Sequence, residues 1–255
     1  MVIDRERVKQ AFQEYTDRYD IHDEKIRLKV EHTYRVADIS EQIAEKLGLS
    51  EEDIALAWLI GMLHDIGRFE QLKRFNSFEA DTMDHATYGV QVLFEEGMIR
   101  QFIEEDTWDD VIRTAIAKHS DYELTGITDE RTLLHARLIR DADKLDNCRV
   151  KLEDAMETLL DLSADEVGKY AISPKVREDA FAGKCICSKD RRTPMDYWVS
   201  YVAYFYDLNF RETLDIVAEE QYVKRIIGRV PYTNEQTKKT MEELERQLTE
   251  YVRRK

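Results

Sequence analysis

A histidine and an aspartate stand side by side, as His64-Asp65, at the end of the apolar run 54–63. That run is typical of a buried core, where an imidazole and a carboxylate are costly unless a partner satisfies them. A metal ion would be such a partner. Further candidate ligands are spread along the chain, namely His32, His85, His119 and Asp143. Imidazole and carboxylate groups bind several transition metals, and two such ions can act together on a phosphoryl group, so this set predicts a two-metal site.

Helical spacing turns these histidines toward the interior. Apolar residues recur three or four positions away from each of them, as they do on the buried face of a helix. Metal ligands must converge, and inward-facing side chains of several helices can do so. The neighbours that define these faces are Leu28, Val36, Ile39 and Ile43 for His32; Ile60 and Gly61 for His64; Tyr88, Gly89 and Val92 for His85; and Ile112, Ala115 and Ile116 for His119.

Each histidine taken alone has a simpler explanation, which is a core imidazole with a hydrogen-bond partner. Four of them on inward faces, together with the His-Asp pair, favour metal binding over packing. Within the segment 140–146, periodicity favours Asp143 only weakly over Asp141 and Asp146, so the choice of aspartate stays open at this point. For His22, in a charged segment between helices, we expect a surface or capping role, and for His135 a structural one.

The elements that must position these residues are helices. Nine glycines and three prolines in 255 residues leave few breaks, and no period-two run indicates a strand. A capping box over residues 50–53, glycines at 48 and 67, and the pairs Ser173-Pro174 and Thr193-Pro194 predict helix ends and starts. We expect helices over 4–19, 23–47, 84–95, 107–119, 131–147, 148–162 and 234–253, one from the capping box to Ile66, and a loop over 68–81.

The length fits one large domain, or a domain with an appended subdomain. All candidate ligands lie within residues 25–150. We therefore expect a helical core with the metal site over residues 1–160 and a C-terminal helical extension over 161–255, packed on the same domain. The aromatic stretch 197–206 is interpreted as a buried core helix, with the face of a homodimer as the alternative.

Composition excludes some partners. With 38 basic and 53 acidic residues the formal charge is −15, which argues against binding of duplex nucleic acid but allows a small phosphorylated ligand beside local cations. The odd number of cysteines (Cys148, Cys185 and Cys187) fits a reducing compartment better than a disulfide framework. The amino terminus lacks an apolar signal core, and the longest apolar run is about half of a bilayer crossing. We therefore expect no membrane partner and a cytoplasmic location.

The ligand order resembles that of the HD superfamily of metal-dependent phosphohydrolases, which is named after an adjacent His-Asp pair. The family order His … His-Asp … Asp is filled by Glu31-His32-Thr33-Tyr34-Arg35-Val36-Ala37, Leu63-His64-Asp65-Ile66-Gly67-Arg68 and Asp141-Ala142-Asp143-Lys144-Leu145-Asp146. The resemblance covers about residues 28–148. It implies an all-α helical bundle, here with additional C-terminal helices. It also selects Asp143 as the last ligand, and His85 and His119 as the extra histidines of the binuclear branches.

The resemblance implies a role for each residue. His32, His64, Asp65 and Asp143 would hold one divalent metal ion, and Asp65, His85 and His119 a second one, with Asp65 bridging the two (Mn, Fe, Mg, Ni or Zn). Asp65 and Arg68 are the expected catalytic residues in the hydrolysis of a phosphate ester or anhydride, with a small nucleotide as the expected substrate. Expected substrate-binding residues are Arg68, Arg35, Lys73 and Arg74. The alternatives are a solvated loop face for Lys73 and Arg74, which is the preferred one, and an ion pair with Asp38 for Arg35. The rings of Phe69, Phe75 and Phe78 would stack a base or, by preference, pack beneath the loop.

The chain also departs from family patterns. The Gly-Tyr-Pro signature of the cyclic-dinucleotide phosphodiesterases is absent, Ser120 follows His119, and Arg68 stands where a lysine is frequent. Arginine still binds anions through two parallel hydrogen bonds. Two alternatives share the scaffold: a di-iron oxygenase, whose ligands are the same, and a non-catalytic nucleotide-binding protein, which degenerate ligands would favour. No ligand here is degenerate.

Overall fold

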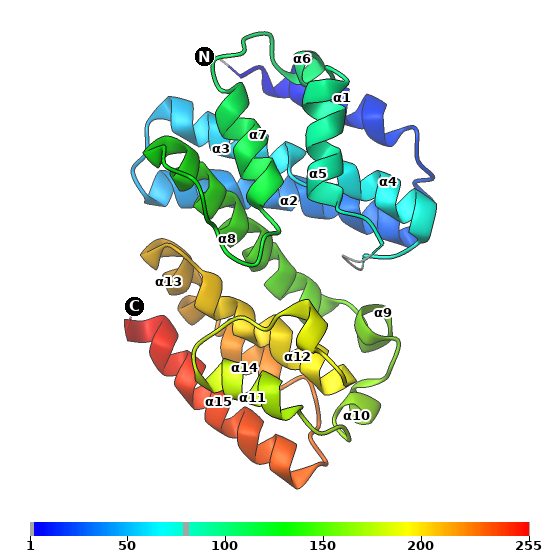
Figure 1. Cartoon of the computed structure of the whole chain (residues 1–255), viewed down its shortest axis with the longest axis vertical. Coiled ribbons are helices and arrows are strands. Elements are labelled where there is room, and N and C mark those ends of the chain that lie inside the picture. Colours follow the sequence, from blue (N-terminus) through cyan, green and yellow to red (C-terminus); the bar gives the residue numbers. More distant parts are fainter. Residues whose placement is uncertain (1–2, 79–81, 255) are drawn as a thin grey trace. The chain divides into compact units, whose positions relative to one another are not determined.

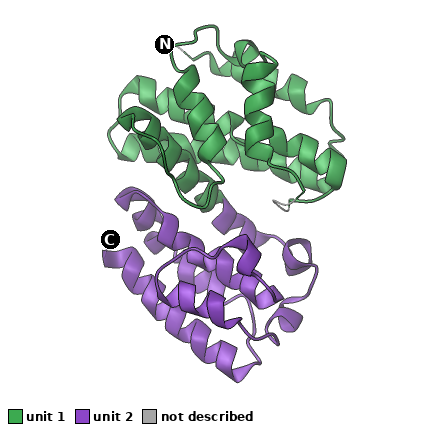
Figure 2. Ribbon diagram, in the orientation of Figure 1, with its two compact units in different colours: residues 1–146 green, residues 147–255 purple. Residues whose placement is uncertain are grey.

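The computed structural model describes residues 3–78 and 82–254, and every regular element in these ranges is a helix (Figure 1). The expected all-α fold is confirmed. The chain divides into two compact units, residues 1–146 and residues 147–255 (Figure 2). The division lies inside one long helix rather than in a linker. The expectation that an extension from residue 161 packs on the same domain stays a prediction.

Side-chain caps start several helices of the first unit. Asp4, Asp23 and Ser50 each accept hydrogen bonds from backbone N–H groups of the following turn, which satisfies donors that a helix start leaves unpaired. The Ser50 cap is the one that the sequence predicted. The helices of this unit are α1 (Arg5–Thr16), α2 (Glu24–Lys46), α3 (Glu51–Leu63), α4 (Ile66–Phe75), α5 (His85–Val90, continued by a π-helical turn Gln91–Glu95), α6 (Ile99–Phe102), α7 (Asp109–Lys118) and most of α8 (Glu130–Glu153).

Two glycines allow close approach of neighbouring helices. A Cβ atom at Gly61 in α3 would lie 2.5 Å from the Cα atom of Ala37 in α2, and a Cβ atom at Gly67 in α4 would lie 2.1 Å from the carbonyl oxygen of His85 in α5. Any larger residue would force these helix pairs apart. The core around α2 and α3 is apolar and is formed by Val36, Ala37, Ile43, Leu56, Leu59, Ile60 and Leu63.

The loop predicted over residues 68–81 is wrong for most of its length, because α4 covers Ile66–Phe75. Residues 79–81 of that segment lie outside the described residues. The periodicity of this segment is weak because α4 is buried on more than one side: Phe69, Gln71 and Leu72 are all buried. Gly67 does not end a helix but serves the contact with α5.

The predicted helix break between residues 147 and 148 is also wrong. α8 continues to Glu153, and a separate short helix, α9 (Met156–Leu160), follows it. Residues 131–153 contain neither glycine nor proline, so nothing in the backbone interrupts the helix.

The second unit contains helices that start as predicted at Pro174 and Pro194, with a full capping box at Thr193. The aromatic stretch 197–206 buries Trp198, Val202 and Phe205, as expected for a core helix. None of the helices in the described ranges combines the length and the apolar composition that a bilayer crossing requires. The helices after α9 are α10 (Ala164–Val167), α11 (Pro174–Phe181), α12 (Pro194–Ala203), α13 (Arg211–Glu219), α14 (Tyr222–Ile227) and α15 (Glu235–Arg254).

Candidate metal centre

The six predicted ligand residues converge in the first unit. They form two groups, within each of which one ligand atom per residue lies within 4.8 Å of the others. Five of the six side chains are buried, and the carboxylate of Asp143 is partly exposed. The first group is His32, His64 and Asp143, and the second is Asp65, His85 and His119.

Four helices and one helix break supply these side chains. α2 carries His32, and α8 carries Asp143. His64 and Asp65 lie at the break between α3 and α4, where the backbone of Asp65 leaves the helical region (φ −105°, ψ 18°). Asp65 precedes α4 but makes no capping hydrogen bond, so its carboxylate is available to the site. His85 opens α5, and His119 follows the last residue of α7.

Hydrogen bonds fix the orientation of three imidazole rings. Nδ1 of His64 lies 2.7 Å from the carbonyl oxygen of Gly61, and Nδ1 of His119 lies 2.7 Å from that of Ile116. Because a carbonyl oxygen only accepts, each Nδ1 carries a proton, and each ring, when neutral, presents the lone pair of Nε2 to the site. His32 is held in the same way, with Nδ1 2.7 Å from a carboxylate oxygen of Asp146. This is the arrangement that orients metal-binding histidines.

The Nε2 atoms of His85 and His119 face each other at 3.0 Å, and the Arg68 guanidinium donates to that of His85 at 2.9 Å. Nε2 of His64 and Oδ1 of Asp65 are buried and have no hydrogen-bond partner, and Nε2 of His32 lies 3.0 Å from Oδ1 of Asp143. Buried acceptor atoms that lie together without a donor are unfavourable unless a cation lies among them. The residues therefore fit bound metal ions.

Asp65 lies between the two groups. Its Oδ1 is 3.2 Å from Nε2 of His85 and 3.6 Å from Nε2 of His119. Its Oδ2 is 3.6 Å from Nε2 of His64 and 3.8 Å from Nε2 of His32. A carboxylate in this position can serve a cation in either group.

The protonation states of His64, His85 and Asp65 match those of metal ligands. Burial lowers the pKa of His64 to about 3 and that of His85 to about 4, which keeps both rings neutral. Burial alone would raise the pKa of Asp65, but the Lys29 ammonium and the charges nearby hold it well below its usual range. For His32, burial and Lys29 lower the pKa, and the hydrogen bonds with Asp143 and Asp146 outweigh them, so that its pKa is raised.

Three residues at the site were not assigned a role from the sequence. The Lys29 ammonium lies 2.7 Å from Oδ2 of Asp65 and is largely buried. Asp146, which the sequence left as an alternative ligand, instead orients His32. Arg140 is buried and donates to the carbonyl oxygens of Lys118 and His119, which holds the end of α7 in place. Lys29 lies three residues before His32, on the same face of the helix, and this spacing is the feature of the sequence that could have identified it as a residue of the site.

Of the expected substrate-binding residues, only Arg68 contacts the ligand groups. Its Nε lies 3.6 Å from Oδ1 of Asp65. Arg35 is exposed, and no contact of it with a ligand residue occurs among the described residues. Lys73 lies over the ring of Tyr19, and Arg74 pairs with Glu70.

The three phenylalanines divide between packing and exposure. Phe69 is fully buried against Phe12, at 5.9 Å between ring centroids, whereas Phe75 and Phe78 are exposed. The Phe78 ring centroid lies 5.7 Å from the Lys29 ammonium. His22 and His135 belong to neither ligand group; His135 is buried and pairs with Asp53.

Comparison with known proteins agrees with this geometry. A family model of the HD domain matches residues 30–148. Searches of curated proteins and of solved structures gave no significant match. The matched range contains all six ligand residues, the His64-Asp65 pair and the orienting Asp146. Residues 30–148, just under half of the chain, are therefore similar to an HD domain.

Proposed function

We propose that the protein is a metal-dependent phosphohydrolase that cleaves a phosphate ester or anhydride of a small nucleotide. The observation that carries the proposal is the position of Asp65, whose two oxygens face the two histidine groups while Lys29 and Arg68 lie beside it. Six ligands in two groups are suited to two divalent cations. When bound, two such ions lower the pKa of water and neutralise charge on a phosphoryl group.

The chain's own cations support a phosphorylated substrate. Lys29 and Arg68 bring two positive charges to the edge of a centre that already attracts anions when metal is bound. Arg68 can offer two parallel N–H donors to phosphate oxygens, and Lys29 offers a compact charge. Both groups would gain interaction energy as negative charge develops on the phosphoryl oxygens.

A nucleotide rather than a smaller phosphoester is supported by Phe78. Its ring is exposed and lies beside Lys29, so a base could stack on it while the phosphate reaches the two cations. The roles of Lys73 and Arg74 in binding substrate stay predictions.

The test is release of phosphate from a panel of nucleotides and other phosphoesters with Mn, Mg, Ni, Zn or Fe, alongside elemental analysis. Lys29→Ala and Arg68→Ala should each lower kcat/KM about tenfold or more with the metal content unchanged, because each removes a charged hydrogen bond. Arg27→Ala, which removes an exposed cation of α2, is the matched control. A protein that releases no phosphate with any metal would contradict the proposal, as would an iron pair that consumes oxygen.

A further inference from the structure

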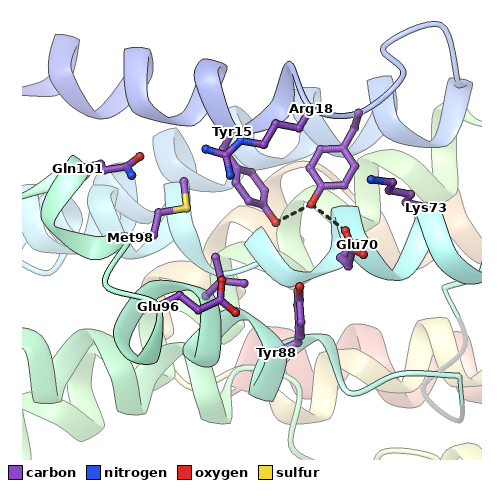
Figure 3. A pocket seen from close by; sticks show the side chains of 10 residues that line it. Tyr15, Arg18, Glu70, Lys73, Tyr88, Glu96, Met98 and Gln101 are labelled. Atoms are coloured by element: carbon purple, nitrogen blue, oxygen red, sulfur yellow. Dashed lines mark hydrogen bonds between the residues drawn. The ribbon is translucent and has the colours of Figure 1, made fainter.

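A cavity of the first unit is lined by none of the six candidate ligand residues (Figure 3). Its volume is about 310 Å³, at the lower end of the range for small-molecule sites. Figure 3 shows Tyr15 of α1 on one side and Glu70 of α4 and Tyr88 of α5 facing it. Tyr19, which follows α1, also lines the cavity. The cavity is therefore built on the helices that also carry Arg68 and His85.

The hydroxyl and carboxylate groups of this cavity already have partners. The Tyr15 hydroxyl donates to the carbonyl oxygen of Ile66 at 2.9 Å. The Tyr19 hydroxyl lies 2.9 Å from that of Tyr15 and 3.3 Å from a Glu70 oxygen. Glu70 also accepts from Arg74, and the carboxylate of Glu96 accepts from a glutamine side chain.

Two cations at the cavity lack such partners. The guanidinium of Arg18 lies 5.6 Å from the ring centroid of Tyr15, and the ammonium of Lys73 lies 5.6 Å from that of Tyr19. Neither side chain has a hydrogen bond or an ion pair with any residue of the described ranges. In a chain with 53 acidic and 38 basic residues, carboxylates are abundant, yet these two cations are left with unused donors at one cavity.

We propose that the cavity binds a small organic anion that carries a planar ring. The anionic group would accept hydrogen bonds from Arg18 and Lys73, and the ring would lie against Val92 and Met98, which are both buried. A cationic ligand is disfavoured because the rings of Tyr15 and Tyr19 already carry the chain's own cations and Glu70 is already paired with Arg74.

The cavity is separate from the metal centre. Arg68 and Glu70 are two residues apart in α4, so their side chains leave the helix about 200° apart. A ligand in the cavity would nevertheless contact the helices that hold the metal-binding residues, because Tyr15 binds the carbonyl of Ile66 and Tyr88 lies one turn after His85. A ligand in this position could act as an effector of the metal centre. The proposed binding does not depend on hydrolysis at that centre.

The experiment is calorimetric titration of the metal-free full-length protein, in which the metal centre holds no cation to attract an anion. The probes are adenosine 5′-monophosphate, 4-hydroxybenzoate, inorganic phosphate and adenosine. We expect at least one of the two ring-bearing anions to bind at least tenfold more tightly than phosphate or adenosine. Which of the two binds distinguishes a nucleotide from an aromatic carboxylate.

Variants locate the bound anion. Arg18→Ala and Lys73→Ala should each weaken binding about tenfold, because each removes a charge-assisted hydrogen bond, and both side chains are exposed, so the fold should persist. Arg27→Ala is the matched control and should bind as the parent does. The proposal is overturned if neither ring-bearing anion binds more tightly than phosphate and adenosine. It is also overturned if the double variant R18A/K73A retains the binding and the double variant K29A/R68A loses it.

Discussion

Asp65 determines more of the proposed chemistry than any other side chain, because it is the only ligand residue whose two oxygens face different histidine groups among those described. The remaining ligands each belong to one group. Substitutions at Asp65 and at a residue of one group should therefore differ in how many metal ions they remove.

Asp65→Ala is expected to abolish binding of both metal ions and turnover. Asp65→Asn, which keeps the shape of the side chain beside Lys29, should do the same with less effect on folding. His85→Ala should lose mainly one metal ion per chain. Elemental analysis after dialysis, with circular dichroism to verify the fold, measures both effects. Two metal ions retained by the Asp65 variants would contradict the bridging role.

Asp146 is expected to affect metal binding through His32, whose ring it orients. Its carboxylate fixes Nδ1 of His32 at 2.7 Å, and loss of such a partner typically weakens metal binding about 10–100-fold. Asp146→Ala should show this loss in a competition with a chelator, and Asp146→Asn, which keeps an acceptor, a smaller one. Glu31→Gln, an exposed carboxylate next to His32 in the chain, is the control. Equal metal affinity of Asp146→Ala and the parent would remove the orienting role.

At this scale the sequence predicted which side chains converge but not how they are supported. The six candidate ligand residues were predicted from inward helical spacing and from the resemblance. Periodicity could not separate Asp143 from Asp146, because both lie on the inward side of one helix and only tertiary contacts tell a ligand from its support. Lys29 was missed because a lysine on an amphipathic helix is ordinarily solvated, and its partner Asp65 is 36 residues away.

At the scale of elements, helix starts were predicted well and helix ends less so. Caps and prolines act locally, and Ser50, Ser173 and Thr193 all precede helices as expected. Gly67 was misinterpreted because a glycine signals either a helix end or a close contact, and sequence does not tell the two apart. Here its neighbour is the backbone of α5, far along the chain.

Gly67→Ala tests this contact. An added methyl group would meet the carbonyl oxygen of His85 at 2.1 Å, so α5 must move away from α4 and carry His85 away from Asp65. We expect a loss of about 1–3 kcal/mol in the free energy of unfolding and loss of the metal ion held by the second group. Gly61→Ala is the matched variant, because it separates α2 from α3 instead and should affect the group of His32 and His64 first. Urea denaturation and elemental analysis measure the two effects, and unchanged metal content in Gly67→Ala would contradict the argument.

At the scale of the whole molecule, burial controls the protonation of the candidate metal site in this acidic chain. The site combines two neutral imidazoles, those of His64 and His85, with carboxylates whose pKa values lie below their usual range. Burial, which lowers the pKa of His64 to about 3 and that of His85 to about 4, opposes protonation of these rings. The same burial must make the stability of the metal-free protein depend on pH.

The metal-free protein is expected to lose stability as the pH falls below about 6.5, where both imidazoles titrate in the unfolded chain. Between that pH and the pKa values of folded His64 and His85, the unfolded chain binds protons that the folded chain does not. The free energy of unfolding should therefore fall by up to about 1.4 kcal/mol per pH unit for each ring, while the loss from the carboxylates begins only below about pH 3.9. Urea denaturation at pH 7.0 and 5.0, followed by the fluorescence of Trp58 and Trp108 in a Trp198→Phe variant, reports on the first unit. His64→Gln should reduce the difference between the two pH values, and equal stability of the parent at both would mean that these rings are not held neutral.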